Sequence, residues 1–112
     1  MLSFQRLDVY RCAVEFFAMA IDLTARMPKG YASLADQFRR AALPGPLNIA
    51  EAAGRTSEAD AARHYAIARG SAMECAAIVD ALKLLSVMTE TEHGKTAELL
   101  SRMVAMLTKL CR

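Results

Sequence analysis

The sequence predicts an all-α protein folded as an antiparallel, up-down-up-down four-helix bundle. Ala, Leu and Met together number 42 of the 112 residues, whereas Val and Ile number only 9, a ratio that favours helix over sheet. Apolar residues recur at intervals of three and four along most of the chain, which is the period of an amphipathic helix. Turn signals divide the chain into four segments with short connections, and short connections make consecutive helices antiparallel neighbours.

Composition bounds the domain count and the location of the protein. A length of 112 residues fits one domain over residues 1–112, and an apolar content of 54% at a net charge of +2 excludes a disordered chain. The longest apolar run covers only residues 16–21, far short of the roughly 20 residues of a membrane span. Charged residues near the N-terminus are unlike a signal peptide, so a cytoplasmic protein without a membrane partner is expected.

The first segment, residues 3–26, carries two apolar stripes side by side. The Leu7 stripe consists of Leu7, Tyr10, Val14, Phe17, Ile21 and Thr24, and the Val9 stripe consists of Val9, Cys12, Phe16, Met19 and Leu23. Together they span about 240° of the helix circumference, which is more than one bundle partner covers. Either this helix lies centrally or other subunits cover one stripe. We expect the Val9 stripe to be a subunit interface.

The second segment is interrupted by prolines. Met27-Pro28-Lys29-Gly30 ends the first helix, and Ser33 with Asp36 predicts an N-cap for the next one. The segment continues to residue 53 and ends at Gly54. Pro44-Gly45-Pro46 removes two backbone donors from its middle, so a kink or a short break is expected there.

The third and fourth segments each begin with a capping signal. Ser57 with Asp60 opens a helix that continues to about residue 87, and Thr89 with Glu92 fits a capping box for the last helix. Ile67, Ile78, Leu82 and Leu85 define the predicted apolar stripe of the third segment. The fourth segment presents to the core Thr96, Leu99, Leu100, Met103, Val104, Met106, Leu107 and Leu110.

No motif for catalysis or for a metal is present. The two histidines, His64 and His93, accompany no recognisable nucleophile motif, and no paired Glu-x-x-His motif of a di-metal bundle occurs. Gly94-Lys95-Thr96 resembles the end of a phosphate loop, but Thr89 stands where that loop requires glycine. The three cysteines are far apart and show no Cys-x-x-Cys spacing. No cofactor and no catalytic residue is predicted.

Polar residues interrupt two helix faces that otherwise read as buried. One group lies on the second segment and one on the third, and we expect the two groups to meet in a polar network: Gln37, Arg40, Asn48, Glu51 and Arg55 with Ser71 and Glu74. Arg40 or Arg55 would pair with Glu74 or Glu51. A structural network that fixes helix register is the favoured interpretation, and a subunit interface or a ligand site remains open.

These residues also carry a family resemblance. The segments are Leu34-x-x-Gln37-x-Arg39-Arg40-Ala41-Ala42, Pro46-x-Asn48-Ile49-Ala50-Glu51-x-x-Gly54-Arg55 and Ala68-Arg69-Gly70-Ser71-x-x-Glu74. The N-terminal Phe4-x-x-Leu7-x-Val9-Tyr10-x-x-Ala13 fits as well. The chain resembles the "four helix bundle protein" family, which includes proteins encoded in intervening sequences of bacterial 23S ribosomal RNA genes. That family is related to the accessory variability determinant proteins of diversity-generating retroelements. The chain departs from the family pattern at two places. It has Pro44-Gly45 where the family has Ser-Ile, and it has Ala52 where the family has Gly.

The resemblance implies a bacterial, cytoplasmic four-helix bundle that assembles into a homo-oligomer, a pentameric ring among relatives. It implies an RNA or a reverse-transcriptase-like protein as partner. The cations expected to contact a nucleic acid are Arg11, Arg63, Lys95, Arg102 and Lys109. A non-enzymatic adaptor is the favoured function. The alternatives are a structural or protein-interaction ring without nucleic acid and an enzyme that uses Glu51, Glu74 and Arg55.

Overall fold

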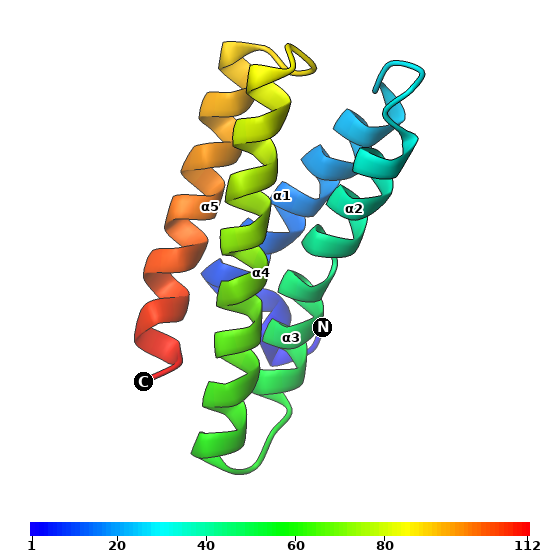
Figure 1. The fold of residues 1–112 in the computed structure, drawn as a ribbon. Coiled ribbons are helices and arrows are strands. Elements are labelled where there is room, and N and C mark those ends of the chain that lie inside the picture. Colours follow the sequence, from blue (N-terminus) through cyan, green and yellow to red (C-terminus); the bar gives the residue numbers. More distant parts are fainter.

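A computed structural model describes all 112 residues, and every regular element in it is helical. Figure 1 shows α4 and α5 side by side, α2 and α3 following each other as one interrupted rod, and α1 behind them. The elements are η1 (Ser3–Arg6), α1 (Asp8–Ala25), α2 (Ala32–Ala42), α3 (Pro44–Ala53), α4 (Glu58–Leu84) and α5 (Glu90–Leu110). Counting the α2–α3 rod once, the predicted four-helix bundle is confirmed. No helix is long and apolar enough to cross a bilayer.

The N-terminal helix is shorter than the sequence predicts. Residues Ser3–Arg6 form a single 3₁₀ turn, and Leu7 has an extended backbone (φ −67°, ψ 133°) that separates this turn from α1. The Gln5 side chain accepts a hydrogen bond from the Leu2 N–H at 2.7 Å, which stabilises the separate turn. The Leu7 backbone therefore lies before the helix rather than within it.

The second rod is kinked at its prolines, as the sequence predicts. α2 ends at Ala42, α3 begins at Pro44, and Leu43 between them keeps helical angles (φ −64°, ψ −40°). Pro44 and Pro46 have no N–H, so the carbonyls of Arg40 and Ala42 lose their helical donors. The Ala41 carbonyl, which receives no backbone hydrogen bond from Gly45, accepts one from the Ser71 hydroxyl on α4. The break is thus compensated from the neighbouring helix.

Capping explains most of the other helix ends. The Ser57 hydroxyl accepts from the Asp60 N–H at 3.0 Å, and the Thr89–Glu92 capping box forms in both directions, at 2.9 and 3.1 Å. The cap predicted at Ser33 is wrong, because α2 already begins at Ala32. Its N-cap residue is Tyr31, which makes no side-chain cap hydrogen bond. α4 ends at Leu84 rather than near residue 87. Ser86 there adopts φ 59°, and the Val87 N–H closes the turn onto the Leu82 carbonyl.

One apolar core contains residues from all five α-helices and the α4–α5 connection. Phe16, Phe38, Ile49, Leu82 and Leu107 are its largest fully buried members. On α4 the core-facing line differs from the prediction, because Ile67 and Leu85 are exposed while Ala68, Ala72 and Cys75 are buried. Small side chains on α4 let the adjacent helices approach closely, so the burial pattern follows size as well as hydrophobicity.

Candidate functional site

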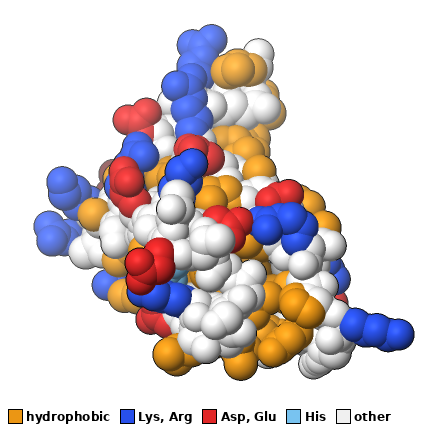
Figure 2. Space-filling model, turned by 90° about the horizontal axis from the view of Figure 1, so that it is seen from above, with side chains coloured by type: hydrophobic (Ala, Val, Ile, Leu, Met, Phe, Trp, Pro, Cys, Tyr) orange, Lys and Arg blue, Asp and Glu red, His pale blue; other side chains and the backbone are white.

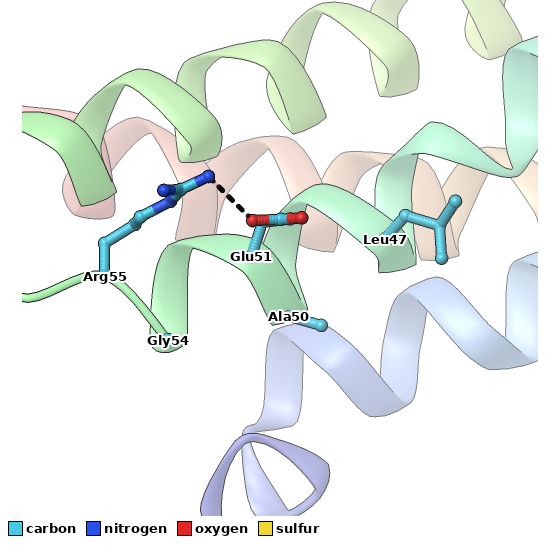
Figure 3. A pocket seen from close by; sticks show the side chains of 5 residues that line it. All are labelled: Leu47, Ala50, Glu51, Gly54 and Arg55. Atoms are coloured by element: carbon cyan, nitrogen blue, oxygen red, sulfur yellow. Dashed lines mark hydrogen bonds and ion pairs between the residues drawn. The ribbon is translucent and has the colours of Figure 1, made fainter.

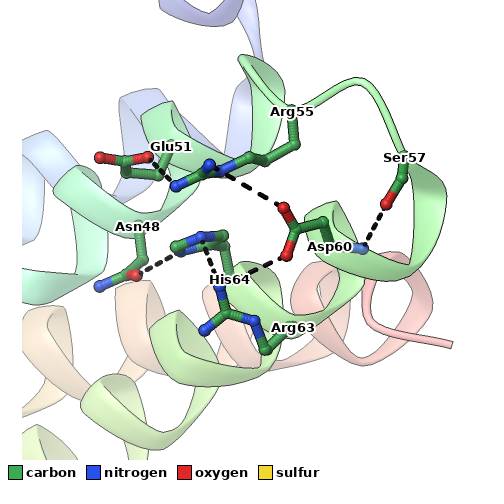
Figure 4. A network of polar contacts seen from close by, with 7 residues as sticks. All are labelled: Asn48, Glu51, Arg55, Ser57, Asp60, Arg63 and His64. Atoms are coloured by element: carbon green, nitrogen blue, oxygen red, sulfur yellow. Dashed lines mark hydrogen bonds and ion pairs between the residues drawn. The ribbon is translucent and has the colours of Figure 1, made fainter.

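Polar side chains from α3 and α4 meet at the corner where the two helices are joined (Figure 4). The Asn48 amide nitrogen donates to the Pro44 carbonyl at 2.9 Å, and Asn48 Oδ1 lies 3.0 Å from His64 Nδ1. On the other side of the imidazole, Arg63 Nη2 lies 3.2 Å from His64 Nε2. His64 is buried, with 8% of its surface exposed. Its imidazole therefore connects Asn48 of α3 with the exposed Arg63 of α4.

The hydrogen-bond pattern assigns the tautomer of His64. The NH₂ group of Asn48 donates to the Pro44 carbonyl. The Asn48 oxygen therefore faces the imidazole, and Nδ1 of His64 carries the hydrogen. Nε2 is then the acceptor for the guanidinium of Arg63, because an arginine only donates. In this arrangement each ring nitrogen of His64 has one hydrogen-bond partner.

Charged side chains surround this buried centre at the surface. Arg55 Nη2 lies 2.9 Å from Glu51 Oε2, and its Nη1 lies 3.9 Å from Asp60 Oδ2. Asp60 Oδ1 also forms an ion pair with Arg63 Nη2 at 3.4 Å. These pairs are largely solvent-exposed, so each contributes little to stability by itself. Their shared effect is to orient Arg55 and Arg63 at the α3–α4 turn.

A shallow hollow of about 500 Å³ opens on α3 beside the corner. Figure 3 shows its five lining residues: Leu47, Ala50, Glu51, Gly54 and Arg55. The Glu51–Arg55 ion pair forms one wall, and Leu47, which is 54% exposed, forms the apolar side. Such an open depression with one exposed Leu suits contact with another macromolecule better than enclosure of a small ligand.

The structure brings together only part of the predicted polar network. Asn48, Glu51 and Arg55 lie in the corner, whereas Ser71 makes its separate contact with the Ala41 carbonyl. Glu74 and Gln37 are exposed. Arg40 pairs with Asp36 at 3.1 Å instead of reaching α4.

The expected buried pair between Glu74 and an arginine is therefore wrong. The core-facing line of α4 passes through Ser71, Ala72 and Cys75, which turns the neighbouring Glu74 outward. Sequence reasoning also gave no structural role to His64, which is buried. Its signal was its position one turn before Ala68, on the line of small residues that α4 buries.

The predicted subunit interface is also corrected. Val9, Cys12, Phe16 and Leu23 are buried within the chain's own core, and Met19 is half-buried. The cover is intramolecular: the Cys12 thiol donates to the Leu99 carbonyl of α5 at 3.3 Å. The Leu7 stripe is the exposed one instead, with Leu7, Val14 and Ile21 at 36%, 40% and 47% exposure.

The five cations predicted to contact a nucleic acid do not form one basic patch. Arg63 belongs to the α3–α4 corner, whereas Arg11 lies on α1 and Lys95, Arg102 and Lys109 lie on α5. Residues 8–26 and 90–110 together carry six acidic and five basic side chains. Lys95 and Arg102 share a hollow with Glu15 and Glu98. The α1–α5 face is thus close to electrically neutral.

Metal-ligating and thiol groups are dispersed. No cluster of three or more His, Cys, Asp or Glu side chains gathers in the structure. Burial raises the pKa of the Cys75 thiol to about 12 and also raises the pKa of Cys12. Both thiols are therefore protonated at neutral pH, which is the state of a structural cysteine rather than a metal ligand.

The fold and the corner define a small antiparallel helical bundle with an interrupted second rod. Residues 5–109 match the family model described as 23S rRNA-intervening sequence protein. The chain belongs to this family. Its structure is similar to the crystal structure of a protein of unknown function from the S23 ribosomal protein family of Bacteroides thetaiotaomicron. The TM-score is 0.85 at 19% identity, with 93% of this chain and 98% of that chain covered. No curated protein matches the chain.

Proposed function

We propose that the protein is a non-enzymatic, homo-oligomeric helical bundle of the bacterial cytoplasm. In this proposal it acts as an adaptor that binds RNA or a nucleic-acid-processing protein such as a reverse transcriptase. The observation that carries the oligomer is the uncovered Leu7 stripe of α1, where Leu7, Val14 and Ile21 are exposed. Tyr10 and Phe17 between them are only half-buried. A continuous apolar stripe on a small protein is typical of an interaction surface.

A second apolar surface supports a ring rather than a two-fold dimer. A groove of about 380 Å³ lies between α4 and α5, and its lining includes Met73, Ala76, Val104 and Ala105. It shares no residue with the Leu7 stripe. When one subunit surface docks on a different surface of the next, the contact is heterologous, and repetition of that contact closes a ring if the rotation permits. A pentamer is one such closed ring.

The test of the oligomer is the molar mass in solution, measured by light scattering at micromolar concentration. Wild type is expected to give a molar mass several times that of the 12.2 kDa chain. Ile21→Glu places a charge in the stripe and is expected to give the monomer mass, because an unpaired charge is costly in an apolar interface. Leu84→Glu is the control, since Leu84 is 86% exposed and lies outside both surfaces. A monomeric wild type contradicts the proposal.

The ring without a nucleic acid is the second candidate, and the near-neutral α1–α5 face favours it. The two functions differ in affinity for RNA. Phosphate contacts release counterions, so an RNA adaptor binds more weakly as salt rises. A fluorescence-anisotropy titration of a structured RNA at low and physiological salt separates them. Absence of binding at low salt supports the second candidate.

A further inference from the structure

One short region of the chain carries an excess of positive charge. Residues 27–43 carry Lys29, Arg39 and Arg40 against Asp36 alone, a net charge of +2, which equals that of the whole chain. Figure 2 looks down on the end of the bundle that carries the α1–α2 and α4–α5 turns, where side chains of both charges are present. Residues 27–43 therefore present a local excess of positive charge to an anionic polymer.

Within this region the fold forms a hollow lined by two unpaired cations. The hollow measures about 310 Å³ and lies between the end of α1 and the first two turns of α2. Lys29 and Arg39, ten residues apart, both line it, because Gly30 at φ 102° reverses the chain directly after Lys29. Tyr31 lines the same hollow and adds an aromatic ring and a hydroxyl group.

The pairing of charges distinguishes these two cations from their neighbours. Arg26 is held by Asp22 and Glu92, and Arg40 is held by Asp36. Lys29 and Arg39 form no ion pair, and no carboxylate lines the hollow. On the α1 side of the hollow, the Thr24 hydroxyl already donates a hydrogen bond to the Ile21 carbonyl at 2.9 Å. The ionic side chains that line the hollow are therefore both positive.

We infer that the hollow at the α1–α2 turn binds a phosphate group of an RNA backbone through Lys29 and Arg39. The inference rests on the proposed RNA-binding function and specifies its contact surface. A guanidinium presents two parallel N–H donors that match two phosphate oxygens, and an ammonium adds a point charge. Phosphate contacts carry no base information, so binding through this hollow is independent of RNA sequence.

The experiment compares two double variants that remove the same charge from different faces. Lys29→Gln with Arg39→Gln alters the hollow, and Lys95→Gln with Arg102→Gln alters the α1–α5 face. All four residues lack ion pairs, and each double variant lowers the net charge by the same amount. The probe is a fluorescein-labelled RNA hairpin, titrated by anisotropy between about 50 and 200 mM salt. Circular dichroism establishes that each variant is folded.

The hollow variant is expected to bind the hairpin about tenfold more weakly at the lower salt. The slope of log K against log salt is negative, and its magnitude is expected to decrease by about 1 for each lost contact. The α1–α5 variant is expected to stay close to wild type. Equal losses in both variants, or a larger loss in the α1–α5 variant, overturn the inference and leave the RNA-binding function standing. Failure of wild type itself to bind at low salt overturns the proposed RNA binding together with the inference.

Discussion

At the scale of single residues, Asn48 has the most specific role. Its amide satisfies the Pro44 carbonyl within α3 and its oxygen accepts from the buried His64 of α4. Removing it leaves a buried imidazole N–H without an acceptor, and an unsatisfied buried donor costs more than the net gain of an ordinary hydrogen bond. One side chain thus ties the proline break to the neighbouring helix.

Asn48→Ala is expected to lower the free energy of unfolding by about 1–3 kcal/mol, measured by urea denaturation. Glu51→Ala, one turn further along α3, is the matched control, because its ion pair with Arg55 is exposed and is worth less than about 1 kcal/mol. Equal losses in the two variants would show that the Asn48–His64 contact contributes nothing beyond a surface pair.

The cysteines differ in their access to reagents. Cys12 and Cys75 are buried, and Cys111 is partly exposed beyond the end of α5. Desolvation raises the pKa of Cys75 to about 12, and the thiolate is the reactive species. At pH 8 a thiol-specific chromogenic disulfide is expected to label Cys111 alone in the native protein and all three cysteines after unfolding in urea. Rapid labelling of all three in the native state would contradict the buried positions.

At the scale of elements, the start of α5 is held by the carboxylate of Glu92. The Thr89 N–H donates to this carboxylate, Arg26 from the end of α1 pairs with it, and both lower the pKa of Glu92. A carboxyl group whose pKa is lower in the folded state stabilises the protein above its unfolded pKa. That stabilisation is lost as pH falls through the folded pKa.

The free energy of unfolding of wild type is therefore expected to decrease as pH falls below about 4.5, the ordinary pKa of a glutamate. Glu92→Gln keeps an oxygen that can accept from Thr89 but removes the charge, so its stability is expected to change less over the same range. Denaturation curves at several pH values between about 3 and 6 measure this difference. Parallel pH profiles for the two proteins would mean that the charge of Glu92 adds no pH-dependent stability.

Helix ends were predictable where the signal is local. The Thr89–Glu92 box, the Ser57 cap and the proline kink are each set within a few residues, and all three are confirmed. The cap at Ser33 was not predictable, because the turn closed by the Tyr31 N–H on the Pro28 carbonyl starts α2 earlier. The extended Leu7 likewise has no local sequence signal that differs from the helix after it.

At the scale of the whole molecule, the sequence shows which residues are apolar but not which neighbour covers them. Both stripes of α1 were visible in the sequence. The packing of α5 over Cys12 decides that the Val9 stripe is internal, and that packing depends on residues more than 80 positions away. Glu74 was misplaced for a related reason, since the rotation of α4 is set by its small residues against several helices at once.

The charge distribution is another property of the whole molecule. Basic residues are spread along the entire sequence. Lys29 and Arg39, which form no ion pair, lie together at one end of a body 45 Å long and 21–24 Å across. In a ring with the subunits in equivalent positions, this end would be repeated once per subunit. Several weak phosphate contacts would then act together and raise the avidity for one RNA molecule.

The proline break between α2 and α3 has a consequence for local motion. Its two halves have 11 and 10 residues, and isolated helices of that length are marginal in water. Ser71 and His64 of α4 supply hydrogen-bond partners on either side of the break, so the rod keeps its order only while it stays attached to α4. The amide hydrogens of α3 should then exchange with solvent in the same cooperative opening as those of α4.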